Sequence, residues 1–226
     1  MSRFKEFLKV GHWPTLFSAF LYFDFFFAVW VLNGAMAPFI SEAFNLTPQQ
    51  KGIMISVPIM SGALMRFPLG LLSQYIGRKN AALVEMGSIL IAMIWGFFVV
   101  KSYSDVLVMG VLLGLAGASF GVALSLGSGW YPPKYKGLAM GIAGAGNSGT
   151  VLAVLFAPPL AQKFGWQAVY GFGALTMILP FFVMVLFAKE PPDKGKHTLK
   201  EHVACLWEKD GWVFNAVYIV TFGGFI

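Results

Sequence analysis

Charged residues are scarce in this sequence. Only 12% of its 226 residues are Asp, Glu, Lys or Arg, whereas a soluble domain carries about 25%. Hydrophobic residues make up 58% of the chain and include 23 phenylalanines, too many to hide in a core of this size. The shortage of charge excludes an ordinary soluble domain and indicates a protein whose surface faces lipid.

The sequence contains a single cysteine, Cys205. No intrachain disulfide can therefore form. His197 and His202 lie near Cys205, but a solvated amphipathic linker explains this charged segment better than a metal site does. The sequence also lacks a nucleophile–base pair, a phosphate-binding loop and a basic patch interleaved with aromatics. We therefore expect no enzyme activity, no cofactor, no metal site and no binding of nucleic acid.

Long apolar runs take the place of charge. Windows of about 20 apolar residues, the length that spans a bilayer as a helix, fall at 16–40, 52–72, 80–100, 106–128, 137–160 and 168–188. Backbone groups in lipid must be hydrogen-bonded within helices or closed barrels, and these runs lack the alternation of barrel strands. The pattern predicts an all-α, polytopic membrane bundle of six transmembrane helices. We expect a six-helix transporter-type unit over 1–188, a cytoplasmic linker over 189–210 and an incomplete seventh helix over 211–226.

Lysine and arginine are unevenly distributed between the segments that separate these runs. If the N-terminus is cytoplasmic, three basic residues face outward, Lys51, Lys101 and Lys163, and twelve face inward. The inward set is Arg3, Lys5, Lys9, Arg78, Lys79, Lys134, Lys136, Lys189, Lys194, Lys196, Lys200 and Lys209. This asymmetry predicts a cytoplasmic N-terminus by the positive-inside rule. The expected location is the cell membrane, with the lipid bilayer as a partner.

Three charged residues fall inside the predicted spans: Asp24, Arg66 and Glu85. A charge there costs at least about 2.5–3.5 kcal/mol, which makes each one a functional-site hypothesis. Arg66 lies roughly 9 Å and Asp24 roughly 12 Å from the cytoplasmic end of its span. One interpretation is a permanent ion pair between them; the other leaves Arg66 to bind an anion and Asp24 to respond to protons. Glu85, nearer the membrane edge, is expected to neutralise Arg78 or Lys79.

A G-x-G-x-x-G pattern occurs in GIAGAGNSGT, at Gly144, Gly146 and Gly149. A dinucleotide-binding turn of this form needs a strand before it and an acidic residue about 20 residues further on. Both flanks are apolar here, and the next acid is Glu190. The pattern therefore belongs to a membrane helix.

Small residues on this fifth span predict close helix packing. Four of them fall within about 60° of one another on a helix, at a spacing that lets two membrane helices approach: Gly137, Gly141, Gly144 and Ser148. Gly146 and Gly149 fall elsewhere and leave backbone bare beside Asn147. Asn147 either makes an interhelical hydrogen bond, worth about 0.6–2 kcal/mol, or contacts a ligand; the helix alone favours the hydrogen bond.

Several stretches of sequence carry a family resemblance. The first, GLLSQYIGRK, resembles the major facilitator loop motif G-x-L-x-D-x-x-G-R-K/R at Gly70, Gly77, Arg78 and Lys79, and departs from it at Gln74, where an acid is usual. More specifically, VPIMSGALMRFPLGLL, APFISEAFNLTPQQKG and AGAGNSGT resemble the nitrate/nitrite porter family of that superfamily. The resemblance covers essentially the whole chain. It implies a 3+3 helix repeat and alternating access around a midplane site.

The same resemblance assigns four side chains to an anion site. Arg66 matches the second-helix arginine that contacts nitrate, and Asn147 matches the asparagine of the fifth-helix signature. Phe120 resembles a fourth-helix aromatic that packs on the planar ion, and Tyr218 resembles a seventh-helix tyrosine beside the site. The family's second arginine, on the eighth helix, has no counterpart before the chain ends. A C-terminal transporter half is therefore an expected partner.

The expected function is transport of nitrate, nitrite or both, by exchange or by proton-coupled uptake, with Asp24 as the residue for proton coupling. Two alternatives remain open. One is a transporter of the same superfamily for another small anion. The other is a non-transporting membrane subunit that binds a partner through its glycine stripe.

Overall fold

The computed structural model describes residues 3–192 and 207–223. The chain forms two compact units, Met1–Asp193 and Lys194–Ile226. Most of the expected linker, including His197, His202 and Cys205, lies outside the described residues.

Membrane-length helices dominate the first unit. Among the described residues, six helical segments are long and apolar enough to cross a membrane. They are Trp13–Ala43, Pro48–Ile76, Arg78–Phe98, Tyr103–Ser128, Pro133–Phe164 and Trp166–Phe187. Each overlaps its predicted window, so the predicted all-α bundle of six spans is confirmed.

Three of the spans are built from shorter pieces. The elements of the first unit are α1 (Arg3–Val10), α2 (Trp13–Trp30), α3 (Leu32–Ala43), α4 (Pro48–Ile76), α5 (Arg78–Phe98), α6 (Tyr103–Gly114), η1 (Leu115–Ala118), α7 (Ser119–Ser128), α8 (Pro133–Gly144), η2 (Ala145–Ser148), α9 (Gly149–Phe164) and α10 (Trp166–Phe187). The second unit contains α12 (Lys209–Gly223). The 3₁₀ turns η1 and η2 interrupt the fourth and fifth spans, and such turns within a long helix often mark functional positions.

Polar caps and glycines set the ends of the spans. Thr47 opens α4 and Ser102 opens α6, each with a capping box that satisfies backbone N–H groups at the helix start. Gly77 and Gly165 have φ of +91° and +86°, values that side chains disfavour and glycine tolerates. They make the short turns that precede α5 and α10.

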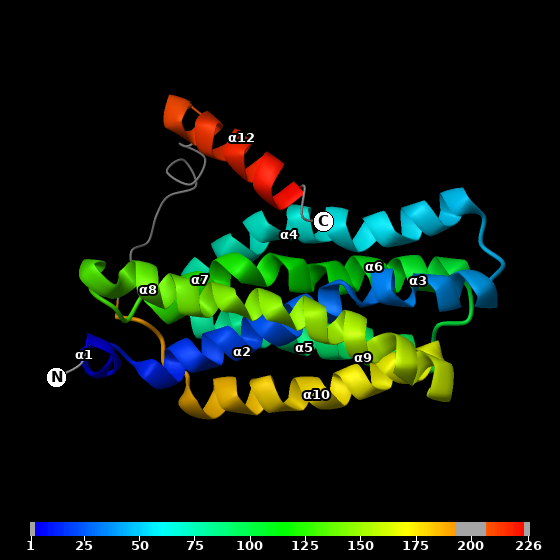
Figure 1. The fold of residues 1–226 in the computed structure, drawn as a ribbon, viewed down its shortest axis with the longest axis horizontal. Coiled ribbons are helices and arrows are strands. Elements are labelled where there is room, and N and C mark those ends of the chain that lie inside the picture. Colours follow the sequence, from blue (N-terminus) through cyan, green and yellow to red (C-terminus); the bar gives the residue numbers. More distant parts are fainter. Residues whose placement is uncertain (1–2, 193–206, 224–226) are drawn as a thin grey trace. The chain divides into compact units, whose positions relative to one another are not determined.

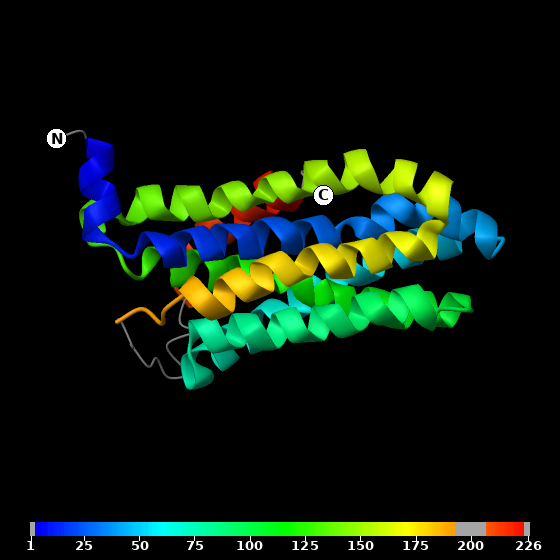
Figure 2. The same cartoon turned by 90° about the horizontal axis from the view of Figure 1, so that it is seen from below.

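The first and fourth spans form the interior of the bundle. They have 67% and 61% of their apolar window buried, more than any other span of the first unit. Helix α4 packs against α6 and η1, α10 packs against α5, and α2 packs against α7 and α9. Figures 1 and 2 show these long helices side by side, with α1 running across one end. This arrangement buries η1, whereas η2 lies against α2 with Gly146 buried and Ala145 and Ser148 exposed.

Candidate functional site

Arg66 lies deeper in the membrane span than its sequence position predicted. Helix α4 continues to Ile76, so Arg66 is about ten residues, or roughly 15 Å, from the helix end. That depth is about half of a 30 Å hydrocarbon core. The side chain is half-buried, and its Nε donates a hydrogen bond to the carbonyl oxygen of Gly117 in η1 at 3.3 Å.

Glycines allow the fourth span to reach Arg66. A Cβ at Gly114 would lie 2.5 Å from Ser61 on α4, and a Cβ at Gly117 would lie 2.5 Å from the Trp30 ring. The indole Nε1 of Trp30 donates to the carbonyl oxygen of Pro58 at 3.0 Å. The first, second and fourth spans are therefore packed closely against one another near the Arg66 guanidinium.

Asp24 lies on α2 and faces the other interrupted span. Its exposed fraction is 7%, and the Oγ of Ser148 donates to its Oδ1 at 2.7 Å. Ser148 is the last residue of η2. Within the described residues, Asp24 thus has a hydroxyl partner and not the ion pair with Arg66 that the sequence left open.

The close approach of the fifth span occurs at glycines outside the predicted stripe. A Cβ at Gly146 would lie 2.7 Å from the backbone nitrogen of Asp24, and a Cβ at Gly149 would overlap the carbonyl oxygen of Asp24. The reason is η2: a 3₁₀ turn has 3.0 residues per turn instead of 3.6, so residues after it point in other directions than an unbroken α-helix predicts. The stripe glycines make no close approach to the described residues: Gly137, Gly141 and Gly144.

Two aromatic rings connect η1 to η2. Phe120 follows η1 on α7, and its ring centroid lies 5.3 Å from that of Phe23. Phe23 in turn packs against η2, where a Cβ at Gly146 would lie 2.9 Å from its ring. Asn147 is the next residue. The structure therefore brings the turn that holds Arg66 and the turn that carries Asn147 against one aromatic pair.

The Asn147 side chain is half-buried in η2. Its Oδ1 is shielded from solvent and has no hydrogen-bond partner among the described residues. The interhelical hydrogen bond that the helix alone favoured is therefore not made by this oxygen within residues 3–192.

Two further predicted residues are Tyr218 and Gly70. Tyr218 is 39% exposed and lies on α12, in the second unit, so its role beside the site stays a prediction. Gly70 of the loop motif lies on α4, and no described atom comes within 4 Å of a Cβ built there.

Glu85 does not neutralise Arg78 or Lys79, so that expectation is wrong. It lies about two turns into α5, is 2% exposed, and accepts a hydrogen bond from the Tyr22 hydroxyl. Its Oε1 has no hydrogen-bond partner among the described residues. Glu85 is thus a buried acid paired with a phenol in the interior.

The acid that meets the loop motif is Glu190, which sequence reasoning missed. The backbone N–H groups of Arg78 and Lys79 donate to its two carboxylate oxygens at 2.8 and 2.9 Å. Lys79 Nζ also donates to the carbonyl oxygens of Val185 and Ala188 at 2.9 and 2.7 Å. A carboxylate is favourable at the N-terminus of a helix such as α5, and the signal was an acid directly after the sixth span.

A cavity of about 290 Å³ between α2, α9 and α10 reaches Asp24. Apart from Asp24 and Thr176, its walls are apolar or glycine residues. The carboxylate is therefore not sealed off entirely by the surrounding helices.

Comparison with known proteins agrees with this architecture. The Major Facilitator Superfamily matches residues 18–226. The nitrite extrusion protein of Bacillus subtilis is 28% identical over 201 residues, which cover 88% of this chain and 51% of that protein. The probable nitrate transporter NarT of Staphylococcus carnosus is 33% identical over 174 residues, 74% of this chain and 44% of that protein.

The Staphylococcus aureus protein of the same name is 31% identical over 163 residues, 71% of this chain and 41% of its own length. The chain thus spans about half the length of the curated relatives it matches. With the family match over nearly its full length and six apolar spans, the chain belongs to the Major Facilitator Superfamily and is a multi-pass protein of the cell membrane.

Proposed function

We propose that this chain is part of a transporter, not an enzyme, that carries nitrate, nitrite or both by alternating access. The observation that carries the proposal is the guanidinium of Arg66, half-buried roughly 15 Å from the end of α4 and bonded through Nε to η1. A charge at this depth marks a substrate pathway by default. Relatives named as a nitrite extrusion protein and a nitrate transporter support this substrate class.

The chemistry of the three site residues suits a flat anion. A guanidinium is planar and can donate paired hydrogen bonds to two oxygens of one ion, whereas an ammonium supplies charge without that fork. The Nε contact to Gly117 fixes the plane of Arg66. Phe120 offers an aromatic face, and the Nδ2 of Asn147 offers one more donor.

The proposal includes a second half. Transporters of this kind rock two six-helix halves around a midplane site, and the matched residues cover only about half of each relative. We propose that residues 1–188, with a cytoplasmic N-terminus and a 3+3 repeat, act with a C-terminal half. The segment 189–210 then serves as the linker, residues 211–226 begin the seventh helix, and Tyr218 adds a fourth contact to the anion.

Arg66→Lys tests the substrate assignment. The chain is expressed in cells that lack their own nitrate and nitrite carriers, alone and together with the C-terminal half of a relative. We expect Arg66→Lys to abolish saturable nitrate uptake in whichever context supports it, while Arg3→Lys on α1 leaves uptake unchanged. Unchanged nitrate affinity in Arg66→Lys contradicts the proposal. If nitrite competes with nitrate uptake and chlorate and carboxylates do not, the substrates are restricted to nitrate and nitrite.

Asp24 is proposed for proton coupling because its carboxylate is buried, bonded to Ser148 and reached by the cavity. Asp24→Asn is expected to remove the dependence of uptake on a pH gradient while nitrate/nitrite exchange continues. Glu42→Gln, at the exposed end of α3, is the matched control. A pH-gradient dependence that survives in Asp24→Asn excludes this role.

A further inference from the structure

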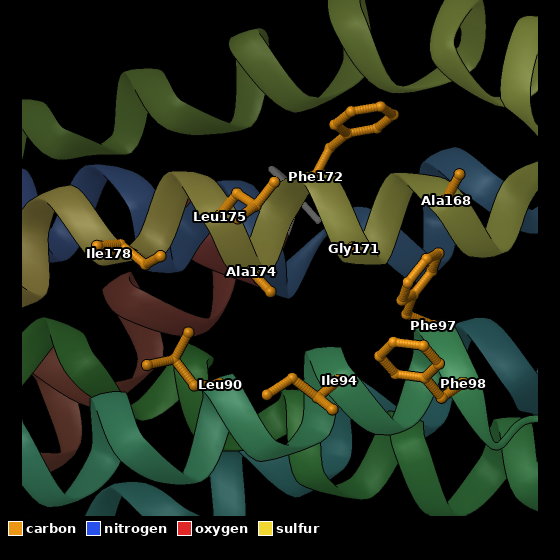
Figure 3. A pocket seen from close by; sticks show the side chains of 10 residues that line it. All are labelled: Leu90, Ile94, Phe97, Phe98, Ala168, Gly171, Phe172, Ala174, Leu175 and Ile178. Carbon is orange, nitrogen blue, oxygen red and sulfur yellow. The ribbon is translucent and has the colours of Figure 1, made fainter.

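A groove runs along the outer side of the first unit, between α5 and α10 (Figure 3). Its volume is about 550 Å³, within the roughly 300–1,000 Å³ of small-molecule pockets. The walls are apolar, with Leu90, Ile94 and Phe97 on α5 and Leu175 and Ile178 on α10. The groove shares one lining residue, Phe172, with the cavity that reaches Asp24, and none with the contacts of Arg66, Phe120 or Asn147 described above.

Small residues on α10 make the groove hollow. Ala168, Gly171 and Ala174 line it where larger side chains would fill the space between the helices. At Gly171 the Phe97 ring comes so close that a Cβ would lie 3.0 Å from it. Figure 3 shows Ala174 and Ile94 facing each other across the gap, so the hollow lies between them.

The length of the groove matches one leaflet of a bilayer. From Ala168 to Ile178 it covers about ten residues of α10, or roughly 15 Å at 1.5 Å per residue. The hydrocarbon core of a bilayer is about 30 Å thick. The groove therefore extends from one membrane face to about the midplane, which suits an acyl chain and is too short for a spanning helix.

A basic side chain shortly precedes the part of α10 that lines the groove. Lys163 is exposed and lies five residues before Ala168, at the end of α9. Its Nζ lies 5.3 Å from the Phe164 ring centroid, and the Phe164 ring lies 5.5 Å from that of Phe172 on the groove wall. These contacts link Lys163 to α10 through Phe172, whose ring points away from α5 in Figure 3 and also lines the cavity that reaches Asp24.

A second lysine follows α5 at the same end of the bundle. Lys101 is exposed and lies three residues after Phe98, which also lines the groove. The nearby Asp105 carboxylate accepts the backbone N–H groups of Lys101 and Ser102 at 3.0 and 2.9 Å and caps α6. Asp105 partly offsets the charge of Lys101, so Lys163 is the stronger of the two attractions for an anion.

We propose that this groove binds one acyl chain of an anionic phospholipid from the leaflet opposite the N-terminus, with the lipid phosphate at Lys163 and Lys101. The apolar walls and the one-leaflet length fit the chain, and the two ammonium groups at that end of the bundle fit the headgroup. An anionic lipid is preferred because a lysine near the membrane surface attracts its headgroup. This proposal does not depend on the identity of the transported ion.

Native mass spectrometry of the full chain, delipidated in detergent, tests the proposal. With palmitoyl-oleoyl phosphatidylglycerol we expect one tightly retained lipid per chain, and weaker retention of phosphatidylcholine. Ala174→Phe fills the groove and is expected to abolish retention of both lipids. Val84→Phe, at an exposed position of α5 outside the groove, is the matched control and retains them.

A separate pair of variants tests whether lysine binds the lipid headgroup. Lys163→Gln is expected to weaken phosphatidylglycerol binding about fivefold, the effect of one lysine near a membrane surface, without changing phosphatidylcholine binding. Lys51→Gln, on α4 and away from the groove, is expected to change neither. Equal loss for both lipids in Lys163→Gln overturns the headgroup assignment.

A labelling measurement guards against misfolded variants. Wild-type chain in vesicles that contain phosphatidylglycerol with a photoreactive acyl chain should be labelled mainly within residues 90–98 and 168–178. Even labelling over all spans overturns the proposal, as does equal lipid retention by Ala174→Phe and Val84→Phe. A second copy of the chain bound in place of lipid overturns it too, and wild-type Ala174 would then lie in a dimer interface.

Discussion

Arg66 and Asp24 both lie inside membrane spans, and each meets a span interrupted by a 3₁₀ turn. At η1 the backbone presents a carbonyl oxygen, and the guanidinium of Arg66 donates to it. At η2 the turn presents the Ser148 hydroxyl, and the carboxylate of Asp24 accepts from it. The two turns thus present hydrogen-bonding groups of opposite character to side chains of opposite charge: an acceptor to Arg66 and a donor to Asp24.

The two turns differ in what their glycines touch. Gly117 of η1 faces the Trp30 side chain, whereas Gly149, directly after η2, faces the backbone of Asp24. A side chain can change rotamer to relieve crowding, but a packed backbone segment moves only with its helix. The contact at η2 is therefore expected to tolerate an added side chain less well than the contact at η1.

Gly149→Ala is the largest expected effect. Its Cβ overlaps the carbonyl of Asp24, so we expect a loss of about 1–3 kcal/mol or more from overpacking, seen as a lower Tm in detergent. Gly141→Ala is the matched control, because no atom of the described residues lies within 4 Å of a Cβ built there and the substitution carries the same gain in helix propensity. Equal Tm values for the two variants contradict the rigid contact.

Gly117→Ala is expected to have a smaller effect on stability, about 1 kcal/mol, because the Trp30 ring can shift. The carbonyl that holds Arg66 belongs to the same residue, so we also expect weaker nitrate binding, measured by titration of the chain. Gly121→Ala, on α7 with open space around its Cβ, should change neither quantity. A lower Tm with unchanged nitrate affinity separates the packing of η1 from anion binding.

Ser148→Ala removes the hydroxyl that donates to Asp24. Hydrogen bonds between membrane helices average about 0.6 kcal/mol, so the expected loss of stability is of that order. Ser88→Ala is the control, since the Ser88 Oγ donates to the carbonyl oxygen of Val84 on its own helix at 3.0 Å. A larger loss at Ser88 than at Ser148 would show that the η2 contact does not hold Asp24.

The smallest expected effect is at His12, outside the membrane turns. Its Nδ1 accepts the Thr15 backbone N–H at 3.2 Å and caps α2. Partial burial, and then the charge of Lys189, lower the pKa of His12 below its ordinary value of 6.5. The unfolded chain therefore binds the proton first, so stability is complete above about pH 6.5 and declines as the pH falls below it.

This pH effect belongs to the end of the bundle that carries His12. We expect Tm to fall modestly between about pH 8 and about pH 5.5. His12→Asn keeps a capping side chain and should flatten that dependence. An unchanged pH slope in the variant would assign the decline to another group.

The six spans were predictable because each is a run of apolar residues of bilayer length, and such a run seldom forms anything other than a transmembrane helix. The turns η1 and η2 were not, since neither contains proline and each depends on glycines meeting another helix. For the same reason the fifth-span glycine stripe, drawn on an unbroken helix, selected Gly137 and Gly141 and missed the contacts of Gly146 and Gly149.

The hydrogen-bond partners of individual residues were harder to predict than the spans. The sequence placed Arg66 inside a span but underestimated its depth, because α4 continues to Ile76. Its contact with Gly117 joins residues 51 apart in sequence. Glu85 was assigned to nearby basic residues by proximity along the chain, whereas its partner Tyr22 comes from another helix. Contacts of this kind depend on which helices are neighbours, and hydropathy does not encode that.

The Glu190 carboxylate has a mechanical consequence. It clasps the start of α5, and three residues later the first compact unit ends at Asp193. The segment that follows α10 is therefore fastened to the start of α5, and the ends of the third and sixth spans are coupled at the loop motif. A displacement of either end is expected to be transmitted to the other through this carboxylate.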